Sequence, residues 1–207
     1  MKNSILVIAL FLATMFANAQ GQFEQGMGQA LTLWGQGKPT EATALFERIA
    51  SAEKTSWLPN YYIGLINALE AFNPKNRENM TAMLAKADAT IDIELAKTPN
   101  NPELLVVRAL SMTALLSSDP MKYGMTMSPQ IAGIYGKAAA IAPENPRVVL
   151  NKARFDMSGA KWTGADVKKL CADVERSRGL FVTFKPETLF SPSWGADQVD
   201  VVLKDCK

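Results

Sequence analysis

The chain has 207 residues, 48% of them hydrophobic and 20% charged, so it can fold around a sizeable core and is not intrinsically disordered. Its 22 Lys and Arg against 20 Asp and Glu leave a net charge of +2, too weak a positive field to favour nucleic acid or an anionic membrane as the main partner. The absence of histidine excludes Ser-His and Cys-His nucleophile pairs, histidine general bases and histidine-ligated zinc.

Residues 1–19 have the composition of a secretory signal peptide. Lys2 supplies a positive charge, residues 5–16 are uncharged and mostly apolar, and Ala17-Asn18-Ala19 has the small-x-small pattern of a cleavage site. An apolar run of this length spans only about 18 Å as a helix, which is too short to cross a membrane. We therefore expect cleavage after Ala19, a periplasmic or secreted mature chain, and no membrane insertion of that chain.

Apolar residues of the mature chain recur at intervals of three and four, the spacing of amphipathic helices. Helix starts are marked by a polar cap followed by proline at Asn101-Pro102, Ser128-Pro129 and Asn145-Pro146, and Thr163 to Asp166 is similar to a capping box. Residues 180–190 have strand-like character but no partner strand. We predict helices over residues 22–36, 39–53, 57–72, 77–97, 102–117, 129–141, 146–157, 164–178 and 195–205.

Internal repetition is the most informative feature of these helices. The segment from Pro99 to Pro102 aligns with the segment from Pro143 to Pro146 at an offset of 44 residues. Small residues, which allow a neighbouring helix to approach closely, recur at equivalent helix positions at intervals of 34, 45 and 44 residues: Ala30, Gly64, Ala109 and Ala153. Such spacing is typical of helical hairpins that bury their apolar faces by stacking on one another.

Residues 23–56 resemble a tetratricopeptide repeat (TPR). Ala30 stands at the small position of the first helix and Gly37 at the turn, and Ala42 and Phe46 stand at the small and aromatic positions of the second helix. The resemblance extends over about 23–178 and is divergent: Lys54 replaces the terminal proline of the first unit, and the later hairpins carry insertions at 73–77 and 117–124. A plain α-helical bundle is the alternative.

The resemblance implies an all-α fold, an α-α superhelix of about four TPR-like hairpins over residues 20–178. A C-terminal segment with a short helix, residues 179–207, would cap the stack. In TPR proteins the first helices of successive units line a concave groove that holds a segment of a partner protein. The register places these residues in that groove: Met27, Leu31, Trp34, Tyr61, Leu65, Val106, Leu110, Arg147 and Arg154.

The function implied by this groove is that of an exported adaptor, which binds a protein or peptide partner in the cell envelope and performs no catalysis. Trp34 and Tyr61 would be its aromatic anchors. The alternative for the same face is that a tightly curved array packs it on itself as core. Two other functions stay open: a binding protein for a small apolar ligand or glycan held between helices, and a hydrolase that uses acidic residues alone.

Three further features bear on chemistry. Cys171 and Cys206 are the only cysteines, and in an oxidising compartment they are expected to form a disulfide, although two free thiols are the alternative. The methionines of the segment Met121 to Met127 could bind Cu(I) or could pack an inserted loop against the helices. Asp88 and Asp92 lie one helical turn apart and are expected to be solvated surface charges. We expect no cofactor and no metal, and the oligomeric state is left open.

Overall fold

The computed structural model describes residues 20–206, so the predicted signal peptide lies outside the described residues. The described residues divide into two compact units, with the boundary between residues 62 and 63. The boundary falls inside helix α3 (Leu58–Ala71), and each unit is described by itself.

The first unit contains one complete helical hairpin and the beginning of α3. A helix over residues 20–35 turns at Gly37, whose φ of 73° is the left-handed conformation that glycine adopts without strain, and α2 (Pro39–Ala52) follows. Phe46 of α2 is fully buried and stacks on Tyr62, with ring centroids 5.1 Å apart. The small residue Ala30 is also fully buried, as the TPR resemblance requires.

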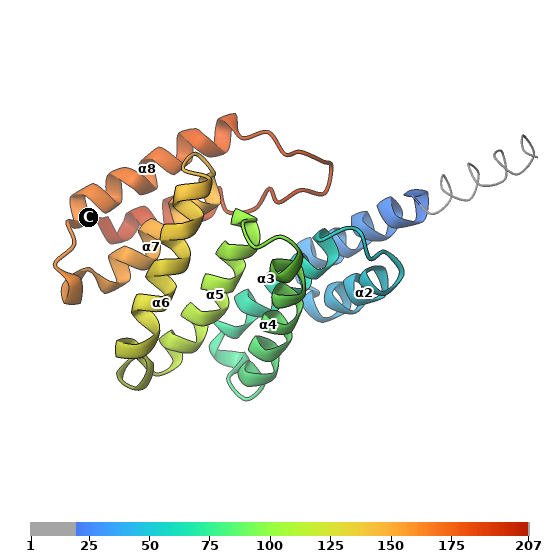
Figure 1. The fold of residues 1–207 in the computed structure, drawn as a ribbon, viewed down its shortest axis with the longest axis horizontal. Helices are drawn as coiled ribbons and strands as arrows, with labels where there is room; N and C mark the ends of the chain where they lie inside the picture. The colour runs from blue at the N-terminus through green and yellow to red at the C-terminus, as the bar shows by residue number, and fades with distance from the viewer. Residues whose placement is uncertain (1–19, 207) are drawn as a thin grey trace, which may run out of the picture. The chain divides into compact units, whose positions relative to one another are not determined.

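The second unit continues with helices that run back and forth, and Figure 1 shows α5, α6 and α7 side by side. No strand occurs within residues 63–206, and the predicted all-α fold of TPR-like hairpins is confirmed. After α3 the elements of this unit are η1 (Pro74–Asn76), α4 (Met80–Lys97), α5 (Pro102–Ser118), α6 (Pro120–Ile141), α7 (Pro146–Thr163), α8 (Val167–Thr183), α9 (Gln198–Val202) and η2 (Leu203–Cys206).

The predicted asparagine caps begin α5 and α7. The Asn101 side chain accepts hydrogen bonds from the backbone N–H groups of Glu103 and Leu104, and Asn145 does the same for Arg147 and Val148. These bonds satisfy donors that have no partner inside the helix, and the proline that follows each cap has no N–H to satisfy.

Small residues line the helix contacts of the second unit. Gly64, Ala109 and Ala153 are all buried, and α5, which carries Ala109, contacts α7, which carries Ala153. At Gly64 of α3 the approach is especially close, because a Cβ atom there would lie 2.6 Å from Cγ1 of the buried Ile91. The close contact at Gly64 is therefore with α4, the second helix of the same hairpin, and the line-up of the small residues between successive hairpins stays a prediction.

Two predicted helix starts are wrong, and the stretch with strand-like character forms no strand. Helix α6 begins at Pro120, capped by Asp119, so the segment predicted to be an inserted loop is helical and Pro129 lies inside the helix. Asp166, and not Thr163, caps α8. The strand-like stretch begins as helix, because α8 continues to Thr183 and the remaining residues to 190 form no strand.

Candidate functional site

The predicted groove residues of the first unit are partly buried in its core. Met27 and Tyr61 are fully buried. Leu31 and Trp34 are half-buried, and the Trp34 ring packs edge-on against Tyr62 with its centroid 6.1 Å away. In this arrangement Leu31 and Trp34 could contact a partner directly, whereas Met27 and Tyr61 support the unit from inside.

In the second unit the predicted groove residues are core residues with one exception. Leu65 and Val106 are fully buried, Leu110 is buried, and the Arg147 side chain is completely enclosed. Arg154 is exposed. In this unit the predicted groove face is packed as core, because α7 lies against α5. This is the alternative that the sequence left open. A partner-binding role for these residues stays a prediction.

A buried ion pair joins the first turns of α5 and α7. The Arg147 guanidinium donates from Nε to both carboxylate oxygens of Glu103, at 3.0 and 2.8 Å, and from Nη2 to Oε1 at 2.6 Å. Asn145 donates to the same Oε1 atom at 2.7 Å. Glu103 and Arg147 occupy equivalent positions after the two cap-proline pairs, so stacking the repeats brings them together.

Aromatic and backbone groups close over this ion pair. The guanidinium carbon of Arg147 lies 4.4 Å from the centre of the Phe184 ring, and Cγ of the same side chain lies 3.7 Å from the position that a Cβ atom on Gly195 would take. The Nη1 atom is buried and has no hydrogen-bond partner among the described residues. Arg147 is fully enclosed and Glu103 is buried, so neither side chain is accessible to a partner, and loss of either one would leave an uncompensated buried charge.

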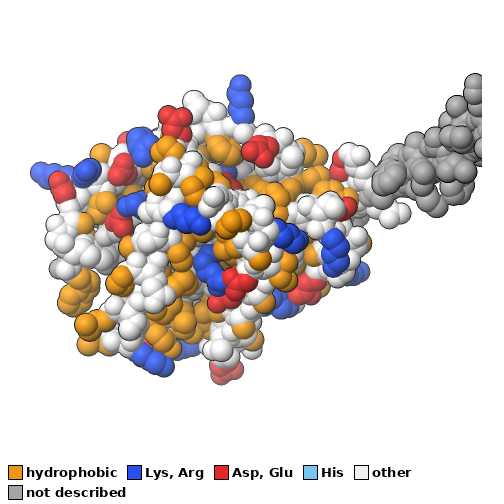
Figure 2. Space-filling model, in the orientation of Figure 1, with side chains coloured by type: hydrophobic (Ala, Val, Ile, Leu, Met, Phe, Trp, Pro, Cys, Tyr) orange, Lys and Arg blue, Asp and Glu red, His pale blue; other side chains and the backbone are white. Residues whose placement is uncertain are grey.

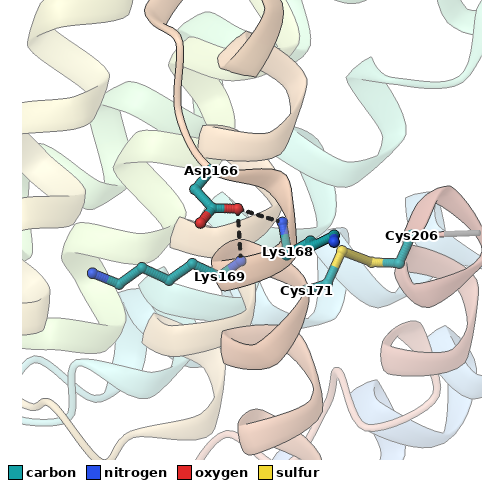
Figure 3. The surroundings of a disulfide bond; sticks show 5 residues. All are labelled: Asp166, Lys168, Lys169, Cys171 and Cys206. Carbon is teal, nitrogen blue, oxygen red and sulfur yellow. Dashed lines mark hydrogen bonds between the residues drawn. A yellow bond between two sulfur atoms is a disulfide. The ribbon is translucent and has the colours of Figure 1, made fainter.

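The C-terminal segment is fastened to α7 and α8. Val199 and Val202 of α9 pack in one cluster with Leu150 and Val174, and the Cys171–Cys206 disulfide joins α8 to the end of η2, as Figure 3 shows. The predicted disulfide is confirmed, with the two Cα atoms 6.0 Å apart. This segment packs against α7 and α8, and a capping role for residues 179–207 stays a prediction.

Exposed apolar side chains gather where α6 begins and α7 ends. Met121 and Met125, one turn apart on α6, are 90% and 93% exposed, and Trp162 near the end of α7 is 78% exposed. Figure 2 shows hydrophobic side chains at this edge of the second unit. Met121 and Met125 therefore do not fill gaps between helices, which was one of the two sequence interpretations. Trp162 was missed because the helix was predicted to end at residue 157.

The two carboxylates considered for catalysis bind an arginine. Arg108 of α5 forms ion pairs with Asp88 and Asp92 of α4, and its Nη1 atom lies 2.7 Å from Oδ1 of Asp88. The Ser111 hydroxyl also donates a hydrogen bond to Oδ1 of Asp88. Asp92 is exposed, as predicted, whereas Asp88 is half-buried, and through Arg108 both carboxylates join α4 to α5. Among residues 20–206 no cluster of three or more Cys, Asp or Glu side chains could hold a metal ion, and no helix is long and apolar enough to cross a membrane.

Comparison with solved structures defines the class of fold. Over 76% of its length the chain superimposes on 74% of a thermophilic TPR protein from Thermus thermophilus, with a TM-score of 0.59 and 15% sequence identity. The fold is therefore that of a TPR-like helical-repeat protein.

A second solved structure matches over more of the chain. The HusA haemophore from Porphyromonas gingivalis aligns with 89% of this chain and 92% of its own length, with a TM-score of 0.70 and 21% identity. No family model and no curated protein matches the sequence.

Proposed function

We propose that this protein is an exported, non-catalytic helical-repeat carrier that binds an apolar, planar, anionic ligand of the porphyrin type. The observation that supports this most strongly is the likeness to a haemophore over nearly the full length of both chains. The disulfide supports export, because such bonds persist in oxidising compartments.

The side chains at the surface agree with a ligand of this kind. Methionine and tryptophan side chains offer polarizable and aromatic surface for a flat apolar ring, and Met121, Met125 and Trp162 expose that surface at one end of a helix pair. Since the chain contains no histidine, recognition would rest on the ring and its carboxylates, and not on an imidazole bound to iron.

The adaptor function predicted from the TPR resemblance is the second candidate. The likeness to a TPR protein favours it, and half-buried Trp34 and exposed Arg154 are accessible to a partner. The burial of Tyr61 and Arg147 weighs against a peptide groove on this face, since neither could contact a partner without movement of the surrounding core.

Titration of the mature chain with haemin and with metal-free protoporphyrin tests the proposal. We expect saturable binding of one equivalent of each compound, a shift of the haemin Soret band and quenching of tryptophan fluorescence, with affinities for the two compounds within about tenfold. The urea-unfolded chain serves as the control for nonspecific adsorption. If neither compound binds saturably, the carrier function is wrong and the adaptor is the remaining candidate.

A further inference from the structure

The residue that follows the expected cleavage site is a glutamine. Ala17-Asn18-Ala19 has the small-x-small pattern of a cleavage site, so cleavage after Ala19 makes Gln20 the first residue of the mature chain. Cleavage turns the backbone nitrogen of Gln20 from an amide nitrogen into a free amine. An amine is a nucleophile, and the carboxamide of the same residue is an electrophile within its reach.

The structure leaves both groups of Gln20 free to move. Gln20 is exposed at the start of the helix over residues 20–35. The first four N–H groups of an α-helix have no acceptor inside the helix, so no intrahelical hydrogen bond holds the nitrogen of this residue. The side chain donates an exposed hydrogen bond from Nε2 to Oε1 of Glu24 at 3.2 Å. Such a bond on a helix surface contributes little to stability, so the side chain can fold back onto the amine.

We propose that Gln20 of the mature chain is a modification site and cyclises to pyroglutamate. The α-amino nitrogen attacks Cδ of the Gln20 side chain and forms the fifth bond of a lactam ring. The bond from Cδ to Nε2 breaks, one amine proton is transferred to Nε2, and Nε2 leaves as ammonia. The reaction consumes no oxidant, reductant or co-reactant.

The product suits the first position of a helix for two reasons. A free α-amine carries a positive charge at the end of the helix where the peptide dipoles already concentrate positive charge, whereas the lactam is neutral. The lactam ring contains N, Cα, Cβ, Cγ and Cδ, the same five atoms as the ring of proline. Proline is favoured at the first helical position, because the N–H that it lacks would have no acceptor there.

The modification gives the mature chain a blocked N-terminus. Aminopeptidases act on a free α-amine, so the lactam would protect the first helix from stepwise degradation after export. This inference rests on the export that the proposed function includes, and it does not depend on the identity of the ligand. A failure of the chain to bind porphyrins would therefore leave it intact.

Mass spectrometry of the exported protein tests the assignment. The full chain is expressed, the mature protein is isolated, and its intact mass and its N-terminal peptide are measured before and after prolonged incubation at neutral pH. We expect a chain that begins at residue 20 and is lighter than its sequence by one molecule of ammonia. A Gln20 that keeps its amine after the incubation would overturn the proposal, and so would a mature chain that begins at another residue or keeps residues 1–19.

Two variants locate the reaction. Gln20→Glu replaces the carboxamide by a carboxylate, which is a much poorer electrophile, so this variant should keep its free amine and lose no ammonia. Gln22→Glu is the matched control, because it changes an exposed glutamine of the same helix that has no free amine. Its chain should lose ammonia as the wild type does. Loss of ammonia from the Gln20→Glu variant would place the reaction at another residue and contradict the assignment.

Discussion

Replacing Glu103 by alanine is expected to lower the free energy of unfolding by about 3–5 kcal/mol. Arg147 is fully enclosed, and three of its hydrogen bonds go to the two oxygens of this carboxylate. Without Glu103 a positive charge stays buried with no counter-charge, and Asn145 also loses an acceptor. Urea denaturation followed by circular dichroism measures the loss.

Two variants separate the charge from the packing. Replacing both partners, with Glu103→Leu and Arg147→Met, should recover most of the lost stability, because no charge is then left buried. Glu144→Ala removes an exposed carboxylate one residue before the Asn145 cap and should change stability by less than about 0.5 kcal/mol. A loss below about 1 kcal/mol for Glu103→Ala would mean that the ion pair does not hold the two repeats together.

Removing the disulfide, with Cys171→Ser and Cys206→Ser together, is expected to cost about 2–4 kcal/mol. The cysteines are 35 residues apart, and the bridge restricts the unfolded chain over this long loop. The variant should also expose the C-terminal segment to proteolysis, because α9 would then be held by the apolar packing of Val199 and Val202 and by the exposed Arg178–Asp200 ion pair, without a covalent link. Urea denaturation and limited digestion measure the two effects.

Wild-type protein in excess reductant is the control for the serine substitutions and should unfold at the same urea concentration as the double variant. Both should unfold well below the oxidised wild type. An identical midpoint for the oxidised wild type and the double variant would contradict a stabilising role for the bridge.

Most of the fold could be predicted from local chemistry. The Asn-Pro pairs mark where α5 and α7 begin. The asparagine side chain accepts hydrogen bonds from backbone N–H groups of the first turn, and the proline has no N–H that needs a partner. Ser128-Pro129 carries the same signal, yet the helix runs through it. The helix begins earlier, at the Asp119-Pro120 cap, and continues through Pro129 although a proline inside a helix removes one backbone hydrogen bond.

The candidate site was harder to predict, for two physical reasons. Periodicity gives the face on which Leu65, Val106 and Leu110 lie, but it does not say whether neighbouring helices cover that face. Glu103 and Arg147 show opposite charges at equivalent repeat positions, a signal from which the buried pair could have been inferred. Prediction of Trp162 as a site residue required the true end of α7, which the apolar stripe does not mark because Trp162 and Thr163 are exposed.

The most direct test of porphyrin binding at the exposed Met121 and Met125 side chains is an NMR titration of protein labelled at the methionine methyl groups. The ring current of metal-free protoporphyrin shifts the signals of methyl groups that it covers. We expect the signals of Met121 and Met125 to shift on addition of one equivalent, while the signal of Met27, buried in the first unit, stays in place. Saturable binding that leaves both the Met121 and Met125 signals unmoved would contradict the assignment.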